Sequence, residues 1–218
     1  MLYVVATPIG DTSEITLRAL EVLKTCDIVI CESTKEASKL LKSHGITGKT
    51  YEILDEHSTS QDKNSLLPLC AEKNVALITD CGTPGFCDPG ADLVRLCRQN
   101  KITVKSVLGA SSLMGLLSLS GRRLDEFVFR GFLPAETEAR AKALKELTRE
   151  KKALIVMDTP YRLKKTLNDM KEHFSQRSFL LTLNLSQEDE CVLEGSIDRV
   201  ISSLPYEKAE FMLLIYPA

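Results

Sequence analysis

The stretch VALITDCGTPGFCDPG, Val75 to Gly90, is the part of the sequence that decides the fold class. It begins with the apolar run Val75–Thr79, which is typical of a buried strand. A loop of Asp, Gly, Thr and Pro follows, and a helix is expected to begin at Ala91. Open α/β sheets bind ligands at the carboxyl ends of their strands, in loops of this kind. The stretch therefore predicts a ligand site on an α/β sheet; a rigid turn without a ligand is the alternative.

The glycines and prolines of this loop favour the ligand site. Gly82 and Gly85 can take positive φ, and without a Cβ they let the backbone approach a ligand closely. Pro84 and Pro89 have fixed φ angles, which stiffens the loop. A loop held in this way is partly preformed, which lowers the cost of ordering it when a ligand binds.

The composition is that of an ordinary globular protein. The chain has 218 residues, of which 44% are hydrophobic and 27% charged, and its net charge is −2. This length suits one large or two small domains. The charge balance argues against binding nucleic acid by bulk electrostatics but allows a local basic patch. We expect no signal peptide and no membrane span, because the first apolar run lacks a charged leader and no run is long enough.

Seven cysteines are scattered along the chain without any CxxC pair. This spacing predicts no zinc or other metal site and no thioredoxin-like centre. We expect reduced, mostly buried thiols and a cytoplasmic protein.

Strand and helix signals alternate through the first half, which predicts a mostly parallel sheet with helices on both faces. The expected strands are Leu2–Ala6, Ile28–Cys31, Thr50–Leu54, Val75–Thr79 and Ile102–Val107. The expected helices are Glu14–Thr25, Lys35–Ser43, Asp62–Glu72 and Ala91–Asn100.

The second half has more consecutive strands, as a mixed α+β domain would. Leu108–Gly121 reads as a buried helix or a hinge, and the expected domains are residues 1–112 and 113–218. The expected strands are Phe127–Gly131, Ala153–Met157, Phe179–Leu185, Cys191–Glu194 and Phe211–Tyr216. The expected helices are Glu136–Glu150, Tyr161–Phe174 and Ile197–Leu204, the first with Ala139, Ala143, Leu144 and Leu147 as its apolar positions.

Four further strand ends resemble ligand loops: Ala6–Asp11, Cys31–Lys35, Gly131–Pro134 and Met157–Arg162. Each alone is also explained by a turn with an N-cap, for which Thr34 and Thr159 are suitable. Several such loops in both halves favour a cleft for a small molecule between two lobes. His57 lies in a loop after a strand and is either a general base or a solvated loop residue. We expect no catalytic role for His44 or His173.

Familiar catalytic fingerprints are missing from the sequence. It has no P-loop, no GxGxxG and no serine nucleophile elbow. A reaction that depends on aligning two reactants is therefore favoured over hydrolysis, and methyl transfer from a cofactor fits.

An ordered set of motifs resembles the tetrapyrrole (corrin/porphyrin) methylase superfamily, the class III S-adenosylmethionine-dependent methyltransferases. The motifs are LYVVATPIGD, TLRALEVLK, CESTK, KLLKSHGI, DEHS, VALITDCGTPGFCDPGADLV, GFLPAE and DTPYR. They cover nearly the whole chain, and the DxGTPxxxDPG loop is highly specific. Within the superfamily the pattern is most similar to the ribosomal RNA small subunit methyltransferase I family, of which this chain resembles a divergent, shortened member.

The resemblance implies a two-lobed class III fold, a homodimer, and S-adenosylmethionine in the cleft between the lobes. It implies transfer of a methyl group to the ribose 2′-hydroxyl of a cytidine in small-subunit (16S) rRNA. It places the cofactor against Pro8, Asp80, Gly82, Thr83, Phe86, Ser111, Ser112, Met157, Asn184, Leu185, Phe211 and Met212. For catalysis we expect Glu32 as the base, with Lys35 and Arg162 on phosphates.

Several motifs depart from the family pattern. Glu32–Lys35 replaces an ED-T-R segment and loses a carboxylate, and Leu108–Ser112 replaces PGPSA. Asp158–Arg162 replaces ESPHR, and Asn184–Glu190 lacks the Arg and Lys of the family segment. The alternatives are therefore a small-molecule (tetrapyrrole-like) or protein acceptor, or a cofactor-binding protein without catalysis. The charged face of Glu136–Lys152 is either a solvated helix face or an RNA contact.

Overall fold

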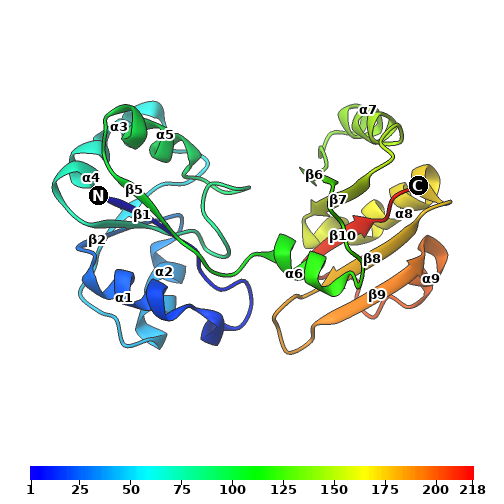
Figure 1. The fold of residues 1–218 in the computed structure, drawn as a ribbon, viewed down its shortest axis with the longest axis horizontal. Coiled ribbons are helices and arrows are strands. Elements are labelled where there is room, and N and C mark those ends of the chain that lie inside the picture. The colour runs from blue at the N-terminus through cyan, green and yellow to red at the C-terminus, as the bar shows by residue number, and fades with distance from the viewer. The chain divides into compact units, whose positions relative to one another are not determined.

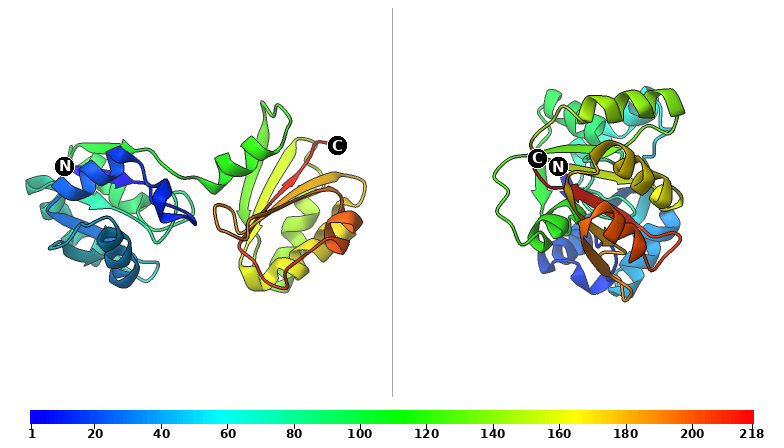
Figure 2. Two further views of the ribbon diagram at one scale, coloured as in Figure 1. Left: turned by 90° about the horizontal axis from the view of Figure 1, so that it is seen from below. Right: turned by 90° about the vertical axis from the view of Figure 1, so that its right-hand side faces the viewer.

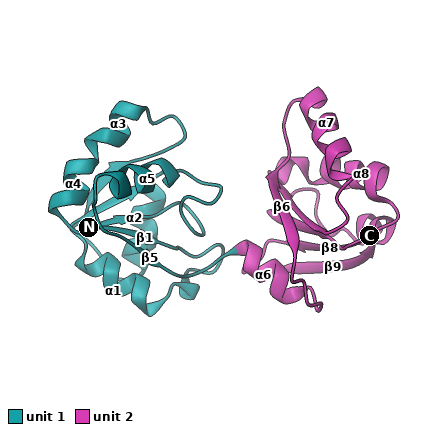
Figure 3. Cartoon of the chain, turned by 45° about the horizontal axis from the view of Figure 1, so that its top comes forward, with its two compact units in different colours: residues 1–111 teal, residues 112–218 magenta.

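Two five-stranded sheets carry the structure, one in each of the two units into which the chain divides (Figure 3). The computed structural model describes all residues from 1 to 218, and its units are residues 1–111 and 112–218.

The sheet of the first unit is entirely parallel, with strand order β3-β2-β4-β1-β5. Its strands are β1 (Leu2–Val5), β2 (Ile28–Cys31), β3 (Thr50–Ile53), β4 (Val75–Leu77) and β5 (Val104–Val107). β1, β2 and β4 are the interior strands of this order, and all of β2 and β4 is buried. The predicted parallel sheet is thus confirmed.

Helices cover both faces of this sheet (Figure 1). The elements are η1 (Thr12–Glu14), α1 (Leu17–Thr25), α2 (Thr34–Ser43), α3 (Ser60–Ser65), α4 (Leu67–Glu72) and α5 (Ala91–Gln99). The buried residues of α1 and α2 pack with Val5, Val29 and Ile78 on one face. Those of α4 and α5 pack with Leu2, Ile30 and Leu77 on the other. The alternation of side chains along each strand supplies both cores.

Local chemistry divides one of the expected helices of this unit and shortens another. The helix expected over Asp62–Glu72 is two helices, because Pro68 near the start of α4 has no N–H to continue the hydrogen bonding. The helix expected from Glu14 begins at Leu17, where the Thr16 hydroxyl accepts from the Ala19 N–H at 3.1 Å.

The second sheet is mixed, as predicted, with strand order β6-β7-β10-β8-β9. Its strands are β6 (Phe127–Phe132), β7 (Ala153–Asp158), β8 (Ser178–Leu183), β9 (Cys191–Ser196) and β10 (Phe211–Ile215). β6 and β7 are parallel, whereas β10 lies antiparallel between β7 and β8. β8 ends before Asn184, because that residue has φ of 47° and turns the chain.

The helices of the second unit are α6 (Ser112–Leu119), α7 (Thr137–Leu147), η2 (Pro160–Arg162), α8 (Leu163–Phe174) and α9 (Ile197–Ser202). Buried residues of α7, α8 and α9 form the larger core on one face of the sheet (Figure 2). Leu113 and Leu116 of α6 pack on the opposite face with Met212 and Leu214. Leu108–Gly121 is therefore an extended segment followed by a half-buried helix, with Met114 and Leu119 exposed.

One expectation about α7 is wrong. Ala139 is exposed, and Arg140 lies on the buried face with Ala143, Leu144 and Leu147. A guanidinium can occupy this position because its donors are paired, as described below.

The cysteines differ in their exposure. Cys26, Cys31, Cys70 and Cys97 are buried, while Cys81 and Cys87 are exposed. Among the helices, none combines the length and apolar character that crossing a membrane requires.

Candidate functional site

The loops after β1 and β4 meet where the helices change sides of the first sheet. β1 leads to α1, which packs on one face, and β4 leads to α5, which packs on the other. β1 and β4 are neighbours in the sheet. A crevice opens at such a switch point, outside the carboxyl ends of the strands, because the two connections leave in opposite directions.

Hydrogen bonds join these two loops. The Thr7 N–H donates to the Gly82 carbonyl at 2.8 Å, and the Gly82 N–H donates to the Thr7 carbonyl at 3.1 Å. The buried Thr7 hydroxyl also donates to the Thr79 carbonyl at 3.2 Å. Gly82 takes φ of 77°, which a residue with a Cβ adopts at a cost. The strand-end loop Ala6–Asp11 therefore lies beside the loop Asp80–Gly90.

A third loop, after β5, completes this edge of the sheet. The Thr83 hydroxyl donates to the Ala110 carbonyl at 3.2 Å. Gly109 lies so close to β1 that a Cβ there would sit 2.9 Å from the Ala6 Cβ. The hydrogen-bonded loops thus contain four expected cofactor residues of this unit: Pro8, Asp80, Gly82 and Thr83. A fifth, Ser111, directly follows Ala110.

The side chains at this edge differ in exposure. Pro8 and Gly82 are buried, so they shape the loops, whereas Asp80 and Thr83 are exposed. Phe86 is 55% exposed. A hollow of about 380 Å³ opens beside Pro8 and Asp80. Its remaining lining residues come from the first loop, α2 and the β4 loop: Ile9, Gly10, Thr12, Glu36, Lys39, Leu40, Ser43 and Cys81.

Glu32 follows β2, the neighbour of β4, and its carboxyl is half-buried. Burial raises the pKa of Glu32 to about 7, and the nearby carboxylates of Asp88 and Asp80 act in the same direction. The backbone N–H of Asp80 donates to the Glu32 carboxylate and opposes this rise in pKa. Burial also raises the pKa of Asp88, and partial desolvation raises that of Asp80, although much of the Asp80 residue is exposed. A carboxyl with a pKa near neutrality can accept a proton at physiological pH.

Lys35 lies two residues beyond the cap of α2 and is exposed. The cap itself is Ser33, whose hydroxyl accepts from the Glu36 N–H at 3.3 Å. The expectation that Thr34 caps this helix is wrong, because Thr34 is its first residue. Thr159 likewise precedes η2 without a side-chain cap bond.

In the second unit, three expected cofactor residues share the α6 side of the sheet. Met157 and Met212 are register partners in β7 and β10, and both pack with the α6 core. Leu185 lies against α6, since a Cβ on Gly115 would come within 2.7 Å of the Leu185 Cδ2. Ser112 is the first residue of that helix. Met212 is buried, whereas Met157 and Leu185 are half-buried, so this side of the sheet presents a partly apolar surface beside α6.

The side chain of Phe211 is not part of this surface. Neighbouring residues of a strand point to opposite faces, and Phe211 belongs to the core with α8 and α9. Asn184 is buried and supports the turn after β8. Its side-chain amide donates to the Asp189 carboxylate at 2.6 Å, and its side-chain oxygen accepts from the Glu210 N–H at 3.0 Å.

Arg162 is bound to a buried polar cluster centred on Asp158. Its Nη1 donates to Asp158 Oδ1 at 2.9 Å, and its side chain is 32% exposed. The fully buried Arg140 donates to Asp158 Oδ2, to Asp169 Oδ2 and to the Thr166 hydroxyl, each at 2.7 Å. It also donates to the Pro134 carbonyl at 3.3 Å, so the Gly131–Pro134 loop joins the same cluster.

Arg140 is the residue that the sequence analysis missed. A signal was present, because Arg140 stands three, four and seven residues before Ala143, Leu144 and Leu147, on their face of the helix. A charged residue within an apolar stripe indicates a buried partner, here the Asp158 carboxylate.

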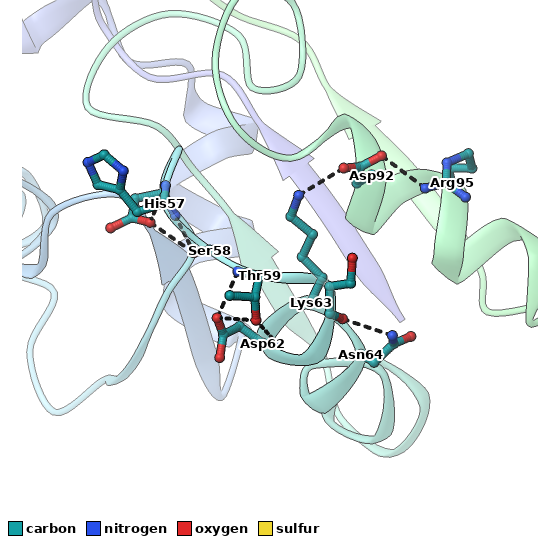
Figure 4. A network of polar contacts seen from close by, with 10 residues as sticks. His57, Ser58, Thr59, Asp62, Lys63, Asn64, Asp92 and Arg95 are labelled. Carbon is teal, nitrogen blue, oxygen red and sulfur yellow. Dashed lines mark hydrogen bonds and ion pairs between the residues drawn. The ribbon is translucent and has the colours of Figure 1, made fainter.

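His57 lies away from the loops after β1 and β4. It follows β3, which is an edge strand, and Figure 4 shows its ring pointing away from its labelled neighbours. Its side chain is 84% exposed and lies 3.6 Å from the Glu56 carboxylate. The neighbouring Thr59 and Asp62 form a capping box at the start of α3. His57 is therefore a solvated loop residue. No group of three or more His, Cys, Asp or Glu side chains is placed to hold a metal ion.

The fold is that of the class III methyltransferases. The chain superposes on diphthine synthase with a TM-score of 0.78 and 13% identity, covering 99% of this chain and 89% of that one. It superposes on the methyltransferase CobJ with a TM-score of 0.69 and 13% identity, covering 100% and 94%. At these identities the likeness shows the fold alone.

Similarity of sequence to known proteins identifies the family. Residues 1–201 match the model of the Tetrapyrrole (Corrin/Porphyrin) Methylases. The chain belongs to this family and is an S-adenosylmethionine-dependent methyltransferase. It is 36% identical to the ribosomal RNA small subunit methyltransferase I of Neisseria meningitidis serogroup B, over 100% of this chain and 76% of that protein. It is 40% identical to the protein of that name from Rickettsia prowazekii, over 98% and 77%.

Proposed function

We propose that this methyltransferase acts on RNA of the small ribosomal subunit and methylates the ribose 2′-hydroxyl of a cytidine. The observation that carries the proposal is identity of 36% and 40% over nearly the whole chain to proteins named for that RNA. Conservation of sequence over both units supports a shared acceptor, since a likeness in the cofactor loops alone would support only a shared methyl donor.

The residues of both units fit S-adenosylmethionine. In the first unit the loops after β1 and β4 approach each other through Gly82, and the Asp80 carboxylate is exposed to accept from hydroxyl or amino groups. We propose that the cofactor contacts these loops at Pro8, Asp80, Gly82, Thr83, Phe86 and Ser111. In the second unit we propose that the half-buried apolar side chains of Met157 and Leu185 hold the adenine ring, with further contacts at Met212, Ser112 and Asn184. When bound, S-adenosylmethionine supplies an electrophilic methyl group on a sulfonium ion.

Glu32 is the proposed catalytic base. A ribose hydroxyl is a weak nucleophile, and removal of its proton as the methyl group transfers makes it a better one. The Glu32 carboxyl, with a pKa raised to about 7, is deprotonated in a useful fraction at neutral pH yet retains affinity for a proton. We place Lys35 and Arg162 on phosphates of the RNA; Arg162 is already oriented by Asp158.

Methyl transfer from tritiated S-adenosylmethionine to small ribosomal subunits tests the proposal. The subunits come from cells lacking the gene for this protein, and the modified nucleotide is mapped on the recovered RNA. We expect one methylated cytidine ribose with the wild-type protein, and none with Glu32→Gln, which should still bind the cofactor in calorimetry. Cofactor binding without methylation of the RNA would instead point to a small-molecule or protein acceptor, or to lost catalysis.

The family also supports a homodimer and a cytoplasmic location, which we propose with the activity. Light scattering coupled to size exclusion measures the first, and fractionation of cells measures the second. A monomer at micromolar concentration would contradict the dimer.

A further inference from the structure

Tyr161 is presented to solvent although its ring is large and apolar. It is 79% exposed, more than any phenylalanine or other tyrosine of the chain, and the other four tyrosines are buried or half-buried. An aromatic ring usually contributes to a core or to a binding surface. Tyr161 does not belong to any of the hydrophobic cores.

The local backbone fixes the direction of this ring. Tyr161 is the middle residue of η2, where Pro160 restricts the first φ angle and the Arg162 N–H donates to the Thr159 carbonyl at 2.9 Å. The next residue, Leu163, is completely buried. Since Leu163 is anchored in the core and Asp158 is anchored before the turn, Tyr161 projects outward from a supported turn and not from a loose loop.

One cation lies over the ring, and a second follows it in the sequence. The Lys208 Nζ lies 4.7 Å from the centre of the Tyr161 ring, within the range of a cation–π contact. The loop carrying Lys208 is tied to α8 by an ion pair between Glu207 and Lys164. On the other side in sequence, Arg162 is oriented by the buried Asp158.

We infer that Tyr161 is a stacking platform for an unpaired base of the RNA substrate, with Arg162 and Lys208 placed for the adjoining phosphates. The inference rests on the proposed function and adds to it a residue that reads the substrate. Proteins that recognise single-stranded RNA stack splayed bases on exposed aromatic rings and hold the backbone with cations. Lys208 lies over one face of the ring, so the base would stack on the other.

A pair of short fluorescent probes separates stacking from phosphate contact. One is an oligocytidylate, and the other is an abasic oligomer of equal length that keeps the ribose-phosphate backbone. Tyr161→Ala should bind the oligocytidylate about tenfold more weakly than wild type, which is ~1.4 kcal/mol and within the range for one base on one ring. Tyr161→Phe keeps the ring and should bind as wild type. The abasic probe should bind all three proteins equally.

Leu17→Ala is the matched control, because Leu17 is 86% exposed and lies on the first unit. It should bind both probes as wild type. Equal affinity of Tyr161→Ala and wild type for the oligocytidylate would overturn the inference, and so would an equal loss on both probes. Unchanged cofactor binding and circular dichroism show that the variant is folded.

Methyl transfer to small ribosomal subunits gives the second measurement. Tyr161→Ala should raise KM for the subunits about tenfold and change kcat by less than about twofold, because the ring binds the substrate without touching the reacting atoms. If the wild-type protein transfers no methyl group to the subunits, the proposed function fails, whatever the probes show. If it does transfer and Tyr161→Ala keeps the wild-type KM, the stacking platform alone is wrong.

Discussion

Glu32 combines two properties at the scale of the single residue: a position at the end of a central strand and a pKa near neutrality. If Glu32 is the base, it must be ionised to act. Its pKa of about 7 therefore predicts that kcat/KM rises about tenfold per pH unit below pH 7 and levels off above it. Methyl transfer measured from about pH 5 to 9 checks this. Glu32→Gln should lower the rate by ~10²-fold or more and abolish the dependence on this group.

Asp88→Asn tests the cause of that pKa. After burial, the charge of Asp88 is the largest contribution that raises the pKa of Glu32. Removing a neighbouring negative charge makes ionisation of Glu32 easier. The rising limb of the plot of kcat/KM against pH should therefore move to lower pH. Glu56→Gln is the matched control, because Glu56 is the weakest of the causes and should move the limb less. A limb that stays in place in Asp88→Asn would contradict the assignment.

At this scale the sequence predicted residues that lie in motifs and missed one that is defined by packing. The apolar run before Asp80 and the glycine at position 82 predicted the loop after β4 in which both residues lie. Arg140 was not identified, because its role depends on Asp158, Thr166 and Asp169, which reach it from other elements. Phe211 and Met212 follow each other in sequence, and only the covering helices show which of them faces α6.

At the scale of elements, the Arg140 cluster joins the β6 loop, β7, α7 and α8. Replacing Arg140 with Met leaves Asp158 buried with Arg162 as its remaining cation. Loss of one partner of a buried ion pair costs ~3–5 kcal/mol, so the free energy of unfolding measured with urea should fall by about that amount. Lys142→Ala, an exposed change on the same helix, should alter it by less than ~0.5 kcal/mol. A similar loss in both variants would show that α7 itself, and not the cluster, is sensitive.

Two glycines test how closely elements must approach. A Cβ at Gly109 would lie 2.9 Å from the Ala6 Cβ and 3.3 Å from the Ala6 carbonyl oxygen. Ala6 directly follows β1 and is held by the hydrogen bond from its N–H to the Val107 carbonyl. Gly109→Ala should therefore destabilise the protein by ~1–3 kcal/mol and weaken cofactor binding measured by calorimetry.

Gly115→Ala is the comparison within α6. The added Cβ meets only the end of the Leu185 side chain, which can rotate, and alanine gains ~1 kcal/mol of helix propensity. Stability should change little, while displacement of Leu185 should weaken cofactor binding if that surface holds the adenine. Wild-type stability in Gly109→Ala would contradict the close approach of the β5 loop to β1.

Most elements of both units were predictable, and the differences have local causes. Hydrophobic runs located the strands of both sheets, and apolar periodicity located α2, α5 and α8 to within a few residues. The split at Pro68 and the cap at Ser33 depend on single hydrogen bonds, which periodicity does not report. The antiparallel placement of β10 between β7 and β8 was not predictable, because strand order depends on pairing between distant segments.

At the scale of the whole molecule, each unit has the requirements of an independent domain. The first has a parallel sheet with a core on each face, and the second has a mixed sheet with a core on each face. Their lengths, residues 1–111 and 112–218, lie in the usual range of domains that fold alone. We therefore propose that the expected division of the chain corresponds to two folding units.

Separate expression of residues 1–111 and 112–218 tests this division. Each polypeptide should show the circular dichroism of an α/β protein and a cooperative thermal transition, because each unit has hydrophobic cores of its own. S-adenosylmethionine at 100 times its Kd should stabilise the intact chain by ~2.7 kcal/mol. Neither polypeptide alone should gain as much, since each supplies only part of the proposed contacts: Asp80 and Gly82 in one, Met157 and Met212 in the other. A non-cooperative transition in either polypeptide would contradict the division, and full stabilisation of one of them would assign the cofactor to that unit alone.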